Sequence, residues 1–248
     1  MEMRVFGRTG MQISVLGFGC GAVGGLMVRG DPLDQERTVA RAIDAGVNYF
    51  DTAVQYGNGE SEKNLGRVLQ RLKPSNVTVG TKVRLPSRDF GGIADAVARS
   101  LEGSPARLRL DRVDIFHLHN AITETGGGEA LSVRQVLGDV VPAFERLRQQ
   151  GKTRFLGLTA VGETAALHQV IDARAFDSAQ VVYNMPIRPR PLRCRRIIQH
   201  RITDGCSIIL LRPVSASSEF ACLLAARCPD RTSGTRLRAL RPNRSARL

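Results

Sequence analysis

Short apolar segments alternate with amphipathic segments along most of the chain, and this alternation limits the folds that the chain can adopt. We expect strands at 16–19, 47–50, 77–81, 113–118, 154–158 and 179–182, and helices at 34–45, 61–72, 92–101, 133–150 and 163–175. The expected strands are short and mostly apolar on both faces, as in a parallel sheet that is covered on both sides. Strands and helices that alternate in this way form either an open doubly wound sheet or a (β/α)8 barrel.

Chemically capable side chains follow three of the expected strands and favour the barrel. Asp51, Lys82 and His119 each come just after a strand, which is where barrels carry their active sites. A barrel needs about 250 residues, and the chain has 248. We therefore predict an α/β fold of the (β/α)8 TIM-barrel class, preceded by a short hairpin over 3–6 and 12–15.

The alternation weakens after residue 184. We expect a seventh strand at 207–211 and a short helix at 219–227, but no eighth strand is recognisable, so the last βα unit is expected to be incomplete. The segment 185–248 holds 14 of the 36 basic residues and 3 of the 23 acidic residues. We predict a barrel over 1–214 and a poorly ordered, arginine-rich tail over 215–248. A frameshift or a truncation is one hypothesis for this change, and a missing strand would expose two sheet edges.

The net charge of +13 raises the question of a nucleic-acid partner. The excess lies in 185–248, where Phe220 is the one aromatic residue, so bases would find little to stack on. Charge alone would give salt-sensitive, non-specific affinity. Nucleic acid is therefore not the partner that we expect.

The hydropathy pattern does not predict a membrane protein. The sequence contains no apolar run of about 18 residues, and residues 1–8 lack the apolar core of a signal peptide. Five cysteines without metal-type spacing fit reduced thiols better than a disulfide framework. We expect a cytoplasmic protein.

Asp51, Tyr56, Lys82 and His119 together suit the reduction of a carbonyl group. A free tyrosine has a pKa of about 10 and is a weak proton donor at neutral pH. A lysine ammonium beside it is expected to lower that pKa, and an aspartate would hold the ammonium charged and in place. A histidine can orient the substrate oxygen while the tyrosine delivers a proton to it. The hydride would come from a cofactor such as NAD(P)H.

Two other interpretations of these segments fit the sequence less well. His117 and His119 share a strand face and could form a metal pair, but His168 and His200 fall on expected helices, so ligands are too few and we predict no metal site. Residues 19–24 match the dinucleotide pattern G-x-G-x-x-G, which should open directly into a helix. Residues 25–32 intervene, so we predict a loop over the mouth of the barrel.

Four segments, in order, resemble motifs of the aldo-keto reductases. They are GVNYFDTAVQYG with GESEKNLG at 46–57 and 59–66, LRLDRVDIFHLH at 108–119, GKTRFLGL at 151–158 and QVVYN at 180–184. The resemblance covers roughly 3–184 and implies a (β/α)8 barrel that binds NADPH, or alternatively NADH, without a Rossmann domain. It implies Tyr56 as the general acid, tuned by Lys82 and Asp51, with His119 orienting the carbonyl of a small aldehyde or ketone.

The same resemblance implies residues that contact the cofactor. Gly21 and Ala22 would lie near it together with Asp51, Gln180 would hold the nicotinamide amide, and Tyr183 would stack on the ring. Thr159 and Ala160 stand where the family usually has Ser-Asn, so Thr159 alone keeps a side-chain hydrogen bond. The turn formed by Arg212 and Pro213 would contact the pyrophosphate. The alternative is a degenerate, non-catalytic relative with a binding or regulatory role.

Overall fold

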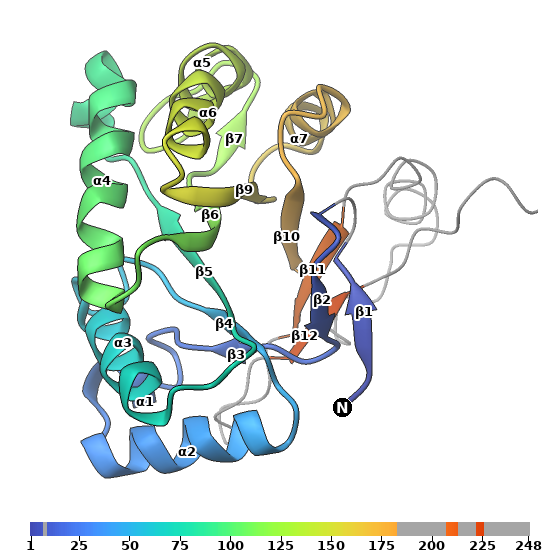
Figure 1. Cartoon of the computed structure of the whole chain (residues 1–248). Coiled ribbons are helices and arrows are strands. Elements are labelled where there is room, and N and C mark those ends of the chain that lie inside the picture. The colour runs from blue at the N-terminus through green and yellow to red at the C-terminus, as the bar shows by residue number, and fades with distance from the viewer. Residues whose placement is uncertain (7–8, 183–206, 213–221, 226–248) are drawn as a thin grey trace, which may run out of the picture.

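An eight-stranded sheet forms the centre of the protein. The computed structural model describes residues 1–6, 9–182, 207–212 and 222–225 (Figure 1). In spatial order the strands are β12 (Cys222–Ala225), β11 (Ser207–Arg212), β10 (Ser178–Val182), β9 (Thr153–Thr159), β6 (Val113–Leu118), β5 (Thr78–Val83), β4 (Tyr49–Asp51) and β3 (Phe18–Gly19). Neighbours from β3 to β11 are parallel, whereas β12 pairs antiparallel with β11.

The sheet curls so that its two end strands, β12 and β3, come into contact (Figure 1). A curled parallel sheet with helices outside it belongs to the (β/α)8-barrel class, as predicted. The strand expected at 207–211 is confirmed as β11. The helix expected at 219–227 is wrong at 222–225, because the apolar run Cys-Leu-Leu-Ala pairs with the edge of β11. A run this short fits a helix or a strand equally well in isolation.

Helices surround the sheet on its outer side (Figure 1). They are α1 (Leu26–Arg29), α2 (Pro32–Asp44), α3 (Glu60–Leu72), α4 (Ile93–Leu108), α5 (Val133–Gln135), α6 (Val141–Gln149) and α7 (Thr164–Asp172), with a 3-10 turn η2 (Ser87–Gly92). The loop expected over 25–32 contains α1. Asp31 caps α2 by accepting from the Leu33 amide, so this helix begins before the expected start at residue 34.

The helix expected over 133–150 forms, but it changes its hydrogen-bonding pattern in the middle. A π-helical turn, η3 (Val136–Val140), separates α5 from α6, and Pro142 occupies the first turn of α6. Proline has no amide hydrogen and is tolerated there. Before this helix, the loop after β6 carries a small parallel pair, β7 (Ile122–Thr123) and β8 (Leu131–Ser132), which the sequence pattern did not predict. Among the described residues, no helix has the length and apolarity to cross a membrane.

The pleat of the strands divides their side chains between two packed regions. Alternate residues such as Phe50, Phe116 and Leu156 face the helices and belong to the main apolar core. The intervening residues face the inside of the barrel. There, Tyr49 and Ile115 join a separate apolar cluster at the end where the strands begin.

The N-terminal hairpin closes that end of the barrel. Strands β1 (Met3–Val5) and β2 (Gln12–Ser14) pair antiparallel, as predicted, and place Phe6, Met11 and Ile13 in the inner apolar cluster. The side chain of Asn48 fastens the hairpin to the start of β4. Its Oδ1 accepts from the Ser14 amide at 2.7 Å and its Nδ2 donates to the Gln12 carbonyl at 2.9 Å.

Gly66 lies where α3 approaches the end of α4 closely. A Cβ atom there would lie 2.5 Å from the backbone carbonyl of Leu108. We expect Gly66→Ala to lower the free energy of unfolding by about 1–3 kcal/mol, because backbone cannot yield as a side chain can. Gly138→Ala is the control, since a Cβ at Gly138 has nothing within 4 Å and alanine favours helix by up to about 1 kcal/mol. Equal stability of the two variants in urea unfolding would contradict this account.

Candidate active site

Five strands bring their carboxyl ends, and the polar residues there, to one end of the barrel. Asp51 ends β4, Lys82 is the penultimate residue of β5 and His119 directly follows β6. Thr159 ends β9 and Gln180 lies in β10, where the two residues are register partners. The parallel order of the strands therefore gathers residues that the sequence scatters over more than a hundred positions.

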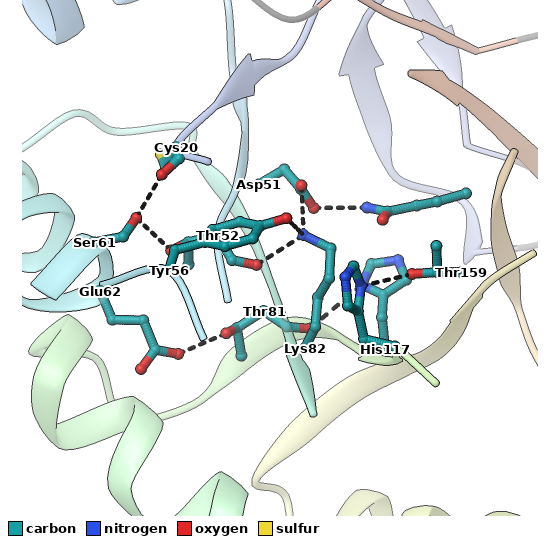
Figure 2. A network of polar contacts seen from close by, with 12 residues as sticks. Cys20, Asp51, Thr52, Tyr56, Ser61, Glu62, Thr81, Lys82, His117 and Thr159 are labelled. Atoms are coloured by element: carbon teal, nitrogen blue, oxygen red, sulfur yellow. Dashed lines mark hydrogen bonds and ion pairs between the residues drawn. The ribbon is translucent and has the colours of Figure 1, made fainter. Parts of the chain in front are cut away.

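The ammonium group of Lys82 is the centre of this site (Figure 2). Its Nζ donates to Asp51 Oδ2 at 2.6 Å, to the Thr52 carbonyl at 2.9 Å and to the Tyr56 hydroxyl at 3.2 Å. Lys82 is fully buried and Asp51 is 4% exposed. The structure thus brings together three of the four residues predicted to be catalytic, in the order Asp51, Lys82, Tyr56.

The fourth residue, His119, faces Tyr56 across the site. Their rings are perpendicular, with centroids 6.5 Å apart. His119 Nδ1 lies 3.1 Å from the hydroxyl of Thr159, which fixes the orientation of the imidazole. Both residues are half-buried, in contrast to Lys82 and Asp51.

The loop that carries Tyr56 has an unusual backbone. The three residues after Tyr56, namely Gly57, Asn58 and Gly59, all have positive φ. Glycine adopts this conformation without strain, and a Cβ at Gly57 would also lie 2.5 Å from Val28 Cγ1. The loop turns sharply into α3 and leaves the Tyr56 ring over Lys82, whose Nζ lies 4.9 Å from the ring centroid.

The charge of Lys82 is maintained despite its burial. Burial alone disfavours the ammonium, but the neighbouring Asp51 carboxylate, and Tyr56 after it, outweigh this effect and raise the pKa of Lys82. A buried lysine without such a partner would lose its proton instead. The site therefore holds one permanent cation directly below the tyrosine.

The expected fall in the pKa of Tyr56 is wrong in its net direction. Burial is the largest influence and raises the pKa of Tyr56, while Lys82 acts in the expected sense but does not outweigh it. A neighbouring charge can be predicted from the sequence, whereas the desolvation of the phenol depends on its depth in the fold. At neutral pH the phenol consequently keeps its proton, which is the form that a proton donor needs.

Both histidines of the site are neutral at physiological pH. Burial, followed by the Lys82 charge, lowers the pKa of His119 to about 4. Burial likewise lowers the pKa of His117 to about 3. His117 is completely buried, and its Nδ1 lies 3.4 Å from the Thr81 carbonyl. In the described part of the chain, no group of three His, Cys, Asp or Glu side chains could hold a metal ion.

The structure places some of the residues predicted to contact a cofactor at the site, and others lie outside the described residues. Gly21 lies beside Tyr56, and a Cβ there would be 3.8 Å from the phenol ring; Ala22 follows it on the surface. Gln180 is 1% exposed, and its Nε2 donates to Asp51 Oδ1 at 2.6 Å, a bond that the sequence did not predict. Arg212 ends β11, while Tyr183 and Pro213 lie outside the described residues.

Sequence reasoning also missed the polar residues that brace the site from behind. The Ser61 hydroxyl donates to the Cys20 carbonyl at 2.8 Å and lies 2.8 Å from the Thr52 hydroxyl, which ties α3 to the ends of β3 and β4 (Figure 2). Glu62 is fully buried and accepts from Thr81 Oγ1 at 2.6 Å and from Arg107 Nε at 2.5 Å. The signal was an acid and a serine on the helix face that packs against the sheet.

Comparison with known proteins agrees with this fold. The family model for the Aldo/keto reductase family matches residues 15–218. The chain belongs to the aldo/keto reductase family.

The curated relatives of the chain include dehydrogenases. The chain is 37% identical over 163 residues to an L-galactose dehydrogenase from Arabidopsis thaliana, covering 65% of this chain and 49% of that protein. It is 29% identical over 188 residues to a D-threo-aldose 1-dehydrogenase from Pseudomonas sp, covering 66% and 55%. The chain thus spans about half the length of the curated relatives that it matches.

Solved structures of aldo-keto reductases share the fold. One from Bacillus halodurans is 24% identical and superposes with a TM-score of 0.64, covering 85% of this chain and 65% of that chain. One from Klebsiella pneumoniae, solved in complex with NADPH, is 26% identical with a TM-score of 0.54, covering 74% and 59%.

The low pKa of His117 predicts that acid weakens the fold through this residue. An unfolded histidine has a pKa of about 6.5, so below that pH the unfolded chain binds a proton that the native site excludes. Stability is full above about pH 6.5 and falls as the pH is lowered toward 3. His117 should account for about 2 kcal/mol of stability lost between pH 7 and pH 5.

Urea unfolding of the natural protein and of His117→Asn at the two pH values measures this contribution. The variant cannot titrate at this position. Between pH 7 and pH 5, the natural protein should therefore lose about 2 kcal/mol more stability than the variant loses. An identical pH dependence in the two proteins would show that the native site accepts the proton.

Proposed function

We propose that the protein is an NAD(P)H-dependent oxidoreductase that interconverts an aldehyde or ketone and an alcohol, with Tyr56 as the general acid. The observation that carries the proposal is the geometry of Lys82, whose buried ammonium lies 3.2 Å from the Tyr56 hydroxyl and 2.6 Å from Asp51. A phenol beside a fixed cation is suited to releasing a proton. The family of the chain and the dehydrogenase relatives support the same reaction class.

The proposed proton transfer depends on a difference between two charge states of Tyr56. Burial raises the pKa of Tyr56, so the phenol is protonated before the reaction. When the proton moves to the carbonyl oxygen, the resulting phenolate faces the Lys82 ammonium in surroundings of low dielectric. An attraction that is strongest after the proton has left stabilises the transition state more than the ground state.

His119 is proposed to orient the carbonyl oxygen. Because the pKa of His119 is about 4, the ring is neutral and carries one proton at neutral pH. If the Thr159 hydroxyl donates to Nδ1, that proton stays on Nε2 and can be donated to the substrate. Lys82 keeps its own proton because the neighbouring Asp51 raises the pKa of Lys82.

The residues at the site fit the nicotinamide end of a cofactor. Gln180 Oε1 is buried without a protein partner and would accept a hydrogen bond from the carboxamide. Thr159 lies beside it on β9, and Gly21 offers no side chain next to Tyr56. When bound, the cofactor would supply the hydride. The NADPH complex of the Klebsiella relative supports this assignment.

The adenosine half of the cofactor is assigned by resemblance alone. We propose that Tyr183 stacks on the nicotinamide ring and that Arg212 and Pro213 contact the pyrophosphate. NADPH is preferred to NADH because the family prefers it. Since two relatives are named for L-galactose and D-threo-aldose, aldoses are the first substrates to test. A cytoplasmic location and a small-molecule partner remain part of this proposal.

Tyr56→Phe tests the proposal. Removal of the hydroxyl should lower kcat on the order of 10²–10⁴-fold, because the general acid is lost, while NADPH binding is unchanged. Consumption of NADPH with a generic aldehyde measures turnover, and cofactor fluorescence measures binding in the same samples. Turnover by the variant within a few-fold of the natural protein would exclude Tyr56 as the acid.

The unaltered protein distinguishes the proposal from its alternative. NADPH binding with turnover that depends on Tyr56 identifies a working enzyme. A folded protein that binds NADPH and turns over neither aldehydes nor aldoses would be the degenerate, non-catalytic relative.

A further inference from the structure

Three polar atoms that the proposed reaction does not use lie buried inside the barrel, and none of them makes a hydrogen bond of standard geometry to a described protein atom. They are the Tyr49 hydroxyl, His117 Nε2 and the Ser178 hydroxyl. All three side chains have no exposed surface. Buried polar atoms are almost always hydrogen-bonded, to protein or to an ordered water, because an unpaired one loses its hydration without compensation. Three such atoms close together therefore need a common explanation.

Two glycines place these atoms together. In the sheet register, Gly157 stands between His117 on β6 and Ser178 on β10. A Cβ at Gly157 would lie 2.6 Å from His117 Nε2 and 2.7 Å from Ser178 Oγ. A Cβ at Gly80 on β5 would lie 2.5 Å from the Tyr49 hydroxyl and 3.4 Å from His117 Cε1. The imidazole of His117 thus lies between the two hydroxyls, and the glycines on β5 and β9 leave room for all three groups.

The hydrogen-bonding capacities of the three groups are complementary to water. The Thr81 carbonyl can only accept, so the proton of the neutral His117 ring belongs on Nδ1, which faces that carbonyl. His117 Nε2 is then an acceptor that needs a donor. Each hydroxyl can donate once and also accept. A water molecule, with two donors and two acceptor sites, can satisfy His117 and both hydroxyls at once.

We propose that Tyr49, His117 and Ser178 form a binding site for an internal water molecule, located in the barrel interior below the Lys82–Asp51 pair. Water donates to His117 Nε2 there and bonds to the hydroxyls of Tyr49 and Ser178. Buried waters that make about three such bonds are integral parts of protein interiors. Below the site, the apolar cluster of Phe6, Ile13 and Ile115 closes the barrel.

The water site supports the groups above it. Tyr49 and Asp51 are on the same face of β4, and Ser178 and Gln180 are on the same face of β10. Burial, followed by the Asp51 carboxylate, raises the pKa of Tyr49, and Gln180 is close enough to the Tyr49 hydroxyl to oppose this shift. Tyr49 and Ser178 are therefore positioning residues, which hold the layer below the Asp51–Gln180 hydrogen bond. This inference does not depend on the proposed enzymatic activity.

Oxygen-17 relaxation dispersion of the solvent tests the site, because it detects water molecules that stay inside a protein. The probe is ¹⁷O-enriched water with the full-length protein. The double variant Tyr49→Phe with Ser178→Ala should lose the signal of one long-lived water relative to the natural protein. Ser104→Ala is the control, since the Ser104 hydroxyl on α4 donates to the Ser100 carbonyl and accepts from Arg107. This variant should keep that water. Equal dispersion in the natural protein and the double variant would overturn the proposal.

Thermal unfolding of the single variants gives an independent answer. If water binds there, removal of either hydroxyl leaves the water with fewer hydrogen-bonding partners. The midpoint of thermal unfolding should then fall by about 2–6 °C. The effects of the two substitutions should not be additive, because they act on one water. If the hydroxyls are unpaired, each substitution removes an unsatisfied group and the midpoint should rise. A rise in either variant would also overturn the proposal.

Discussion

The buried ion pair between Lys82 and Asp51 is the interaction on which the rest of the site depends. Charges this deep inside a protein are tolerated only when they are paired and hydrogen-bonded. The remaining partners of the pair come from separate places in the fold: the Thr52 carbonyl and the Tyr56 hydroxyl face the ammonium, and Gln180 donates to the carboxylate. Because the pair needs all of these hydrogen-bonding partners, it fixes the ends of β4, β5 and β10 relative to one another. It also holds the loop that carries Tyr56.

The pleat of the strands gives the barrel a layered interior. At the end where the strands begin, the hairpin and inward apolar residues such as Ile115 form an apolar cluster. Above it lie the polar groups around His117, with Gly80 and Gly157 providing the clearance that they need. The Lys82–Asp51 pair forms the next layer, and Tyr56 and His119 stand at the mouth, half-buried. Polarity thus rises from the closed end of the barrel to the open end, so solvent reaches the side where a substrate would enter.

Burial, more than charge, sets the protonation states of this site. It keeps His119 neutral and raises the pKa of Tyr56 although a lysine lies beside it. Lys82 is the exception, because Asp51 raises the pKa of Lys82 against the effect of burial. The result is one fixed cation among neutral donors. When a proton leaves Tyr56, a negative charge develops on the phenolate. The Lys82 ammonium is already in place to stabilise that charge.

Sequence patterns were sufficient to predict the alternation of strands and helices, the residues at the strand ends and the family, because apolar periodicity and motif spacing are local properties. Asp51, Tyr56 and Lys82 could be named from their positions in the chain, since parallel strands bring their carboxyl ends together whatever the details of packing. The tertiary structure was needed to establish that the pKa of Tyr56 is raised, because desolvation depends on how deeply the ring is buried. It also decided the bond between Gln180 and Asp51, residues 129 positions apart, and the strand at 222–225, whose pairing depends on the free edge of β11. These features are properties of the surroundings, which a one-dimensional pattern does not contain.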